Sequence, residues 1–201
     1  MKTTSQQPSE IFNRIDIYLF DQILKGRYLS NQAILDTGCG SGRNMFWFYH
    51  NDYELFAVDR NRESIKQVKE LYPKYKDNYV VADLTNLPFD DNSMDHVINS
   101  AVLHFAESIE QFLKMFSELI RVLRSGGSLF IRMTSDVSIE KSVIPLGNGV
   151  FRLPDETTRF LLTRELLQEL LLNFPIQLIE PFKTTNVSDI RAMSTLVFMK
   201  N

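Results

Sequence analysis

Short apolar runs alternate with longer segments of helical period along most of this chain. A short apolar run rich in β-branched residues predicts a buried strand, and apolar positions three and four apart predict a helix packed on a sheet. Their alternation is typical of a parallel sheet with helices on both faces. The predicted strands are 33–37, 54–59, 79–83, 96–101, 128–133, 176–182 and 194–200, and the predicted helices are 43–50, 62–71, 108–124 and 163–173.

Two segments depart from this alternation. Residues 9–29 have apolar side chains at helical spacing, and we expect a helix there that leans on the sheet edge or covers a site. Residues 135–162 contain prolines and glycines without a clear period, and a loop of this length is expected to act as a lid or substrate wall. The pattern predicts one domain, 1–201, with an N-terminal helical cap at 1–30 and an irregular segment at 134–162.

The composition limits the partners and the cellular compartment that we expect for this domain. Net charge is −3, with 22 basic and 25 acidic residues interspersed, so nothing indicates a nucleic-acid footprint. Cys39 is the one cysteine, which excludes an internal disulfide framework and suits a reducing compartment. No stretch has the character of a signal peptide or a membrane-spanning helix, so we expect a soluble, cytoplasmic protein.

The sequence ILDTGCGSGRN, residues 34–44, predicts a strand, a tight turn and the start of a helix. Glycine permits positive φ there and removes the Cβ that would keep a ligand away from the backbone. The helix that follows places backbone N–H groups at the same point. The stretch therefore predicts a nucleotide-type ligand against the turn, although a tight turn without a ligand would use similar residues.

Three acidic residues end successive predicted strands: Asp36, Asp59 and Asp83. The carboxyl ends of parallel strands meet at one edge of a sheet, so these carboxylates are expected to converge. Asp59 stands twenty-one residues after Gly38, where nucleotide-binding βαβ units hold a ribose diol. An acid that only caps the next helix would look the same in sequence.

The glycine spacing and the first acid discriminate between cofactors. A dinucleotide fingerprint needs G-x-G-x-x-G, whereas the third glycine of GCGSG comes one position early. A pyrophosphate would also meet the carboxylate of Asp36, while a cofactor with an amine and a sulfonium would tolerate or favour it. The charge argument favours S-adenosylmethionine over NAD.

Four stretches carry a family resemblance: LDTGCGSGRN at 35–44, AVDRN at 57–61, residues 82–100 and residues 119–133. With these motifs the chain resembles the class I S-adenosylmethionine-dependent methyltransferases, and is similar to their small-molecule and tellurite-resistance type. The resemblance implies an α/β Rossmann-like fold with a mostly parallel seven-stranded sheet and helices on both faces. It also implies a C-terminal antiparallel hairpin, with 176–182 paired to 194–200.

The resemblance also implies roles for individual residues. At the adenosine end, Asp59 would hold the ribose hydroxyls, Arg60 or Asn61 would flank the adenine, Asp83 would accept from its exocyclic amine, and the Leu84 backbone would contact a ring nitrogen. At the methionine end, Gly38 and Gly40 would lie against the chain, and Asp36 would act on the amino group directly or through water. Arg43 would pair with the carboxylate, and Asn99 and Ser100 would face this end.

The implied chemistry is an in-line displacement at the sulfonium methyl, to which the protein contributes alignment and desolvation without a metal or covalent intermediate. His104, just past the fourth predicted strand, is the candidate general base if the acceptor is a hydroxyl. A packing role for this histidine fits the sequence equally well.

The acceptor is less defined than the cofactor. The stretch Asn99 to Val102 lacks the acid-or-asparagine, double proline and aromatic of adenine and glutamine methyltransferases, and Cys39 is misplaced for cytosine-carbon methylation. No added recognition domain is visible, so we expect a small or modest-sized acceptor. Four further residues hint at an anionic or polar one: Tyr18, Arg132, Arg152 and Arg159.

Two other functions remain open at this point. An NAD-type oxidoreductase could use the same doubly wound sheet, although the early third glycine, Asp83 and the C-terminal hairpin count against it. A non-catalytic cofactor-binding protein of methyltransferase fold would carry the same cofactor motifs, because fold does not fix function.

Overall fold

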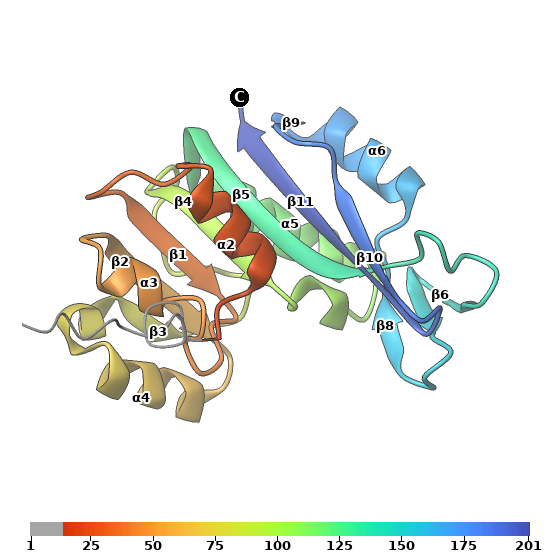
Figure 1. Ribbon diagram of the computed structural model, residues 1–201, viewed down its shortest axis with the longest axis horizontal. Coiled ribbons are helices and arrows are strands. Elements are labelled where there is room, and N and C mark those ends of the chain that lie inside the picture. Colours follow the sequence, from red (N-terminus) through yellow and green to blue (C-terminus); the bar gives the residue numbers. More distant parts are fainter. Residues whose placement is uncertain (1–13) are drawn as a thin grey trace, which may run out of the picture.

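A single mixed β-sheet runs through the computed structural model, which describes residues 14–201, and helices cover both of its faces (Figure 1). The strands lie in the order β10-β11-β5-β4-β1-β2-β3. Five of them are parallel, which confirms the predicted doubly wound core: β1 (Ala33–Thr37), β2 (Glu54–Asp59), β3 (Tyr79–Val81), β4 (Met94–Ser100) and β5 (Leu123–Ser135).

The C-terminal strands run antiparallel to this core. Strand β11 (Arg191–Lys200) pairs with β5, and β9 (Ile176–Leu178) and β10 (Lys183–Val187) both pair with its outer edge. The sheet therefore has seven positions across, as the resemblance implied. The pairing of β9 with β11 confirms part of the expected hairpin, whereas β10 was not predicted.

Two apolar cores form on opposite faces of the sheet. Helices α2 (Ile17–Leu24), α3 (Phe46–Tyr49) and α4 (Arg62–Leu71) cover one face, and Leu19, Phe48 and Ile65 pack there. Helices α5 (Ile109–Val122) and α6 (Arg164–Asn173) cover the other, where Phe112 and Phe116 are buried. Short 3₁₀ turns, η1 (Pro73–Asn78) and η2 (Leu103–Phe105), lead into β3 and α5.

The predicted leading helix is shorter than expected. Its described part begins after Asp16, whose side chain caps the Tyr18 N–H, and ends at Leu24, where Lys25 is followed by Gly26 with φ +67°. The prediction's first residues, 9–13, lie outside the described part. The helix predicted at 43–50 is also wrong in extent, because the glycine turn continues to Met45.

The prediction of irregular structure at 134–162 is wrong in its central part. Three short strands form a separate antiparallel sheet: β6 (Ile144–Gly147), β7 (Val150–Arg152) and β8 (Thr158–Phe160). Asn148 and Gly149, with φ +53° and +79°, make the tight turn between β6 and β7. These strands are too short and too exposed to give a clear apolar alternation.

Candidate functional site

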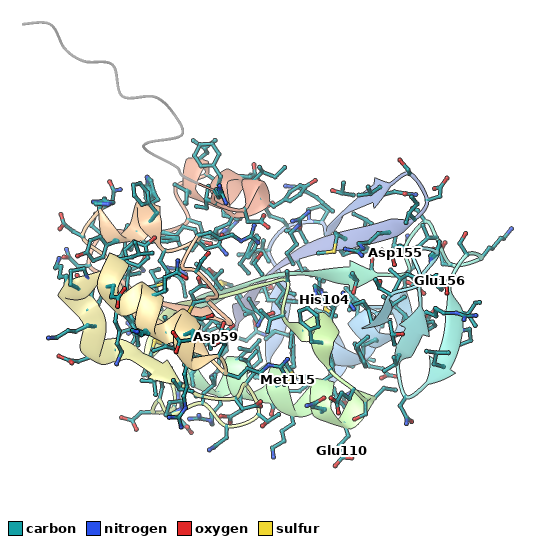
Figure 2. The ribbon with its side chains drawn as sticks, turned by 90° about the horizontal axis from the view of Figure 1, so that it is seen from below. Asp59, His104, Glu110, Met115, Asp155 and Glu156 are labelled. Carbon is teal, nitrogen blue, oxygen red and sulfur yellow. The ribbon has the colours of Figure 1, made fainter. Side chains whose placement is uncertain are left out.

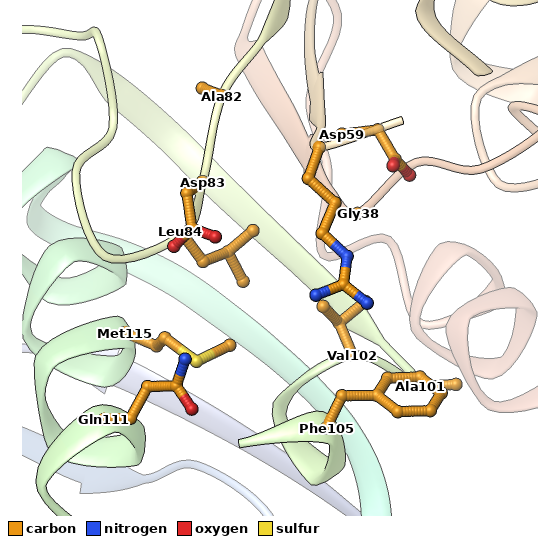
Figure 3. A pocket seen from close by; sticks show the side chains of 11 residues that line it. Gly38, Asp59, Ala82, Asp83, Leu84, Ala101, Val102, Phe105, Gln111 and Met115 are labelled. Carbon is orange, nitrogen blue, oxygen red and sulfur yellow. The ribbon is translucent and has the colours of Figure 1, made fainter. Parts of the chain in front are cut away.

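A cleft of about 210 Å³ opens at the carboxyl ends of the parallel strands (Figure 3). This is the edge at which the sequence predicted a ligand. The lining residues come from the end of β2, from the segments that follow β1, β2, β3 and β4, from η2 and from α5: Gly38, Asp59, Arg60, Ala82, Asp83, Leu84, Ala101, Val102, Phe105, Gln111 and Met115.

The glycine turn forms one wall of the cleft. Gly38 has φ +68°, and a Cβ on it would lie 2.4 Å from Val102 Cγ2, so only glycine fits there. Gly40 has φ +52° and open space where a Cβ would stand, so another molecule can approach its backbone. Ala101, which also lines the cleft, is a non-glycine residue held at φ +64°. Strained backbone of this kind is typical of functional sites.

Asp59 fixes the shape of the turn as well as lining the cleft. Its Oδ2 accepts a hydrogen bond from the Gly40 N–H at 2.9 Å, and its Oδ1 accepts one from the Asn61 N–H at 2.8 Å. The N-cap of α4 is Asn61, whose side chain accepts from the Glu63 N–H, so the capping alternative for Asp59 is wrong. Each carboxylate oxygen keeps acceptor capacity for a hydroxyl in the cleft.

Asp83 and Leu84 form the facing wall (Figure 3). Hydrogen bonds from the Thr85 N–H and hydroxyl lower the pKa of Asp83, so its carboxylate is ionised and can only accept. The loop is anchored from α5, because Glu118 accepts from the Leu87 N–H at 2.7 Å and Arg121 donates to the Leu87 carbonyl at 2.8 Å.

Asp36 and Asn99 lie behind the turn and do not line the cleft. Burial raises the pKa of Asp36 to about 7, and its Oδ2 has no hydrogen-bond partner among residues 14–201. Asn99 donates to Thr37 Oγ1 at 2.9 Å, and its own Oδ1 is likewise buried and unpartnered within that range. Orphaned buried acceptors are uncommon and mark places where a donor can bind.

The two predicted arginines have different positions. Arg60 lines the cleft, and its place beside the adenine stays a prediction. Arg43 does not line the cleft; its Nη2 lies 3.3 Å from Ser100 Oγ and 3.9 Å from the buried Asp16 carboxylate. Its pairing with a cofactor carboxylate therefore stays a prediction.

Arg132 and Tyr18 tie α2 to the sheet and are outside both cavities of the site. Arg132 donates to Asp16 Oδ2 at 3.0 Å, and its guanidinium stands over the Tyr18 ring at 5.1 Å. The Tyr18 hydroxyl contacts Thr185 on β10. These contacts give both residues a structural use that the sequence did not predict.

His104 is buried on η2 and does not line the cleft. It lines a second cavity of about 240 Å³ between η2 and the β7–β8 strands. Burial lowers its pKa to about 4, and its Nδ1 lies 3.4 Å from the Thr134 N–H, which donates to it. The ring is therefore neutral at neutral pH, and its role as a general base stays a prediction.

Sequence reasoning missed about half of the lining: Ala82, Ala101, Val102, Phe105, Gln111 and Met115. The pair Gln111 and Met115 stands four residues apart on α5, the one spacing that could have signalled a shared face. Which end of α5 reaches the cleft depends on how the helix packs, and this is not visible in the sequence.

Comparison with known proteins decides the family of the matched part. The model of a family described as "Methyltransferase domain" matches residues 35–131, which contain the glycine turn, Asp59, Asp83 and the whole of α5. This part of the chain is a methyltransferase domain.

The methyltransferase domain is similar to two curated enzymes. Phthiotriol/phenolphthiotriol dimycocerosates methyltransferase of Mycobacterium tuberculosis is 31% identical over 117 residues, which are 57% of this chain and 42% of that protein. The tRNA (carboxymethyluridine(34)-5-O)-methyltransferase of Saccharomyces cerevisiae is 31% identical over 110 residues, 55% of this chain and 38% of that protein. The chain thus spans under half the length of these relatives.

A solved structure shows that the likeness in fold extends beyond the domain model. The structure of a S-adenosylmethionine-dependent methyltransferase from Methanosarcina mazei superposes with a TM-score of 0.71 and 20% identity, covering 89% of this chain and 96% of that one. The fold is therefore the class I methyltransferase fold predicted from the sequence. The family matched over residues 35–131 implies S-adenosylmethionine as the methyl donor.

The described residues contain neither a membrane-spanning helix nor a cluster of metal-binding side chains. Within residues 14–201, no helix is both long and apolar enough to cross a membrane. Over the same range, no group of three or more histidine, cysteine, aspartate or glutamate side chains is placed to hold a metal ion.

Proposed function

We propose that this protein transfers a methyl group from S-adenosylmethionine to a small or modest-sized acceptor. The observation that carries the proposal is the cleft at the strand ends, where Gly38, Asp59 and Asp83 line one space. When bound, S-adenosylmethionine supplies a methyl on a sulfonium, whose bond to carbon breaks with its electron pair left on sulfur as the acceptor's lone pair bonds the methyl.

The residues fit this cofactor at both ends. Asp59 and Asp83 are acceptors for ribose hydroxyls and an adenine amine, and Leu84 and Met115 offer apolar walls to the base. Gly40 leaves room for the methionine chain, and the orphaned Oδ2 of Asp36, buried behind the turn, would accept from its ammonium directly or through a water. The protein thus contributes binding, alignment and exclusion of water.

The acceptor is proposed to be a small molecule without nucleic acid as a partner. The interspersed acidic and basic residues, with a net charge of −3, support this. The curated relatives point to different acceptors, since one is named for phthiotriol and phenolphthiotriol dimycocerosates and the other for a tRNA, so tRNA is the alternative to be tested. The narrower tellurite-resistance type, the single domain over 1–201 and the cytoplasmic location stay predictions.

Two rival functions predict different results. An NAD-type oxidoreductase would bind NAD, which the acid at Asp36 and the spacing of GCGSG disfavour. A non-catalytic protein of this fold would bind S-adenosylmethionine and transfer nothing. Asp36, Asp59 and Asp83 are all intact, and this agrees with cofactor binding in either case.

Two experiments test the proposal. The first is isothermal titration with S-adenosylhomocysteine and with NAD, and the second is incubation with methyl-labelled cofactor and a cell extract. We expect S-adenosylhomocysteine to bind, NAD not to bind, and label to enter a low-molecular-mass fraction. Label in nuclease-sensitive RNA would overturn the small-molecule acceptor. Binding without protein-dependent transfer would favour the non-catalytic alternative, and NAD binding alone would favour the oxidoreductase.

A further inference from the structure

A second cavity adjoins the cofactor cleft through one shared residue. It measures about 240 Å³ and lies between η2 and the small β6–β8 sheet. Phe105 lines both this cavity and the cleft and is 53% exposed, so its ring is the wall between them. Figure 2 shows His104 between Asp59 and Met115 on one side and Asp155 and Glu156, beside the small sheet, on the other.

The walls of the second cavity combine apolar surface with few polar groups. Its lining is His104, Phe105, Ala106, Glu107, Val150, Thr158, Arg159 and Phe160. Two aromatic rings, a valine and an alanine give flat apolar contact. The polar side chains come from a histidine, a threonine, an arginine and an exposed glutamate. A small volume with a few converging polar groups is typical of a small-molecule site.

Arg159 is the cation of this cavity. Its guanidinium lies 5.1 Å from the centre of the Phe105 ring, and its Nη1 donates to the backbone carbonyl of Thr158 at 2.6 Å. Within residues 14–201 it forms no ion pair, and Glu107 is exposed and not paired with it. A stacked guanidinium without a carboxylate partner keeps free donors for an anionic oxygen.

His104 supplies a neutral donor. Because Nδ1 accepts from the Thr134 N–H, the proton of the neutral ring resides on Nε2. Nε2 has no hydrogen-bond partner in the described part of the chain, and it is not one of the fully buried side-chain atoms that lack a partner there, so a ligand can reach it. Acting as a base through Nε2 would require the other tautomer, which would lose the hydrogen bond from Thr134.

We propose that the second cavity holds the methyl acceptor, and that the acceptor is a small planar molecule with a carboxylate or similar anionic oxygen bound by Arg159 and the Nε2–H of His104. This rests on the proposed function. In this arrangement His104 positions the acceptor, and Phe105 must turn or the acceptor must pass its edge for the acceptor atom to reach the cleft. Of the four residues that hinted at an anionic acceptor, Arg159 is the one in this cavity.

Paired probes test the proposal in the presence of saturating S-adenosylhomocysteine. Benzoate, 4-hydroxybenzoate and 2-naphthoate are each compared with the matching neutral amide by saturation-transfer NMR and titration. We expect the anions to bind more tightly than the amides, and Arg159→Gln to weaken anion binding about tenfold, as for loss of a charge-assisted hydrogen bond. Arg159→Lys should recover part of it.

Arg152→Gln is the matched control, since Arg152 is an exposed arginine on the same small sheet that pairs with Glu156 and does not line the cavity. His104→Phe should weaken anions and amides alike. Anions that bind no better than amides, or an anion preference unchanged by Arg159→Gln, would overturn the proposal while leaving the proposed function intact. Failure of S-adenosylhomocysteine to bind would instead overturn the proposed function.

Discussion

The cofactor cleft and the second cavity are built in different ways. The cleft is formed by the ends of parallel strands, and its polar side chains are held by backbone N–H groups, as Asp59 is by Gly40 and Asn61. The second cavity is formed by a 3₁₀ turn and strands of three residues at the periphery. The cleft is thus held by the core of the fold, whereas the proposed acceptor cavity depends on a small attached sheet that can vary without changing that core.

The largest expected effect is in the glycine turn. Gly38→Ala places a Cβ against Val102 at a positive φ, so we expect S-adenosylhomocysteine affinity to fall about 100-fold or more and the free energy of unfolding to drop by about 1–3 kcal/mol. Titration calorimetry and thermal unfolding measure both. Gly26→Ala has nearly the same φ but open space and no place in the cleft, so a similar loss of affinity there would refute the argument.

Asp59→Ala is expected to weaken S-adenosylhomocysteine binding about 10–100-fold, because it removes acceptors for the ribose and releases the Gly40 N–H. Asp77→Ala, at an exposed acid beyond α4, is the control and should have no effect. Unchanged affinity in the Asp59 variant would exclude the ribose role.

Part of the fold and part of the site could be predicted from the sequence. Strands β1 and β2 were predicted to the residue because an apolar run ends in an acid or a glycine turn. The edge strand β10, KTTNV, was missed because its exposed or half-buried residues carry no apolar alternation. In the site, Asp59 and Asp83 were predictable from strand ends, whereas Phe105 and Gln111 depend on how η2 and α5 pack.

A smaller effect is expected in the pH dependence of cofactor binding. The raised pKa of Asp36, about 7, means that the free protein holds a proton there below neutral pH, and an ammonium beside Oδ2 would favour its loss. We expect affinity for S-adenosylhomocysteine to rise by up to about tenfold from pH 6 to pH 8. Asp36→Asn should flatten this profile. A profile unchanged by the substitution would exclude Asp36 from the amino group.

Asp36 also affects the stability of the free protein. An acid whose pKa is raised on folding lets the native state bind more protons than the unfolded state does. The contribution is therefore favourable at low pH and is lost as pH rises from the ordinary value of 3.8 through about 7.

The smallest expected effect concerns His104 in the second region. Its pKa near 4 predicts no titration of the ring between about pH 5.5 and 8, with the proton on Nε2 throughout. Nitrogen-15 NMR of the imidazole measures both the titration and the tautomer. A proton on Nδ1 would contradict the hydrogen bond from the Thr134 N–H and the proposed donor at Nε2. Because folding lowers this pKa, its contribution to stability is present above pH 6.5 and is lost as pH falls towards 4.

The contacts of α2 have a consequence for how the chain folds. Asp16 meets Arg132, 116 residues later, and Tyr18 meets Thr185, 167 residues later. Contacts this distant in sequence close slowly, and during synthesis α2 reaches neither partner until most of the chain has left the ribosome. We therefore expect the first described helix to be among the last parts of the molecule to acquire its native contacts.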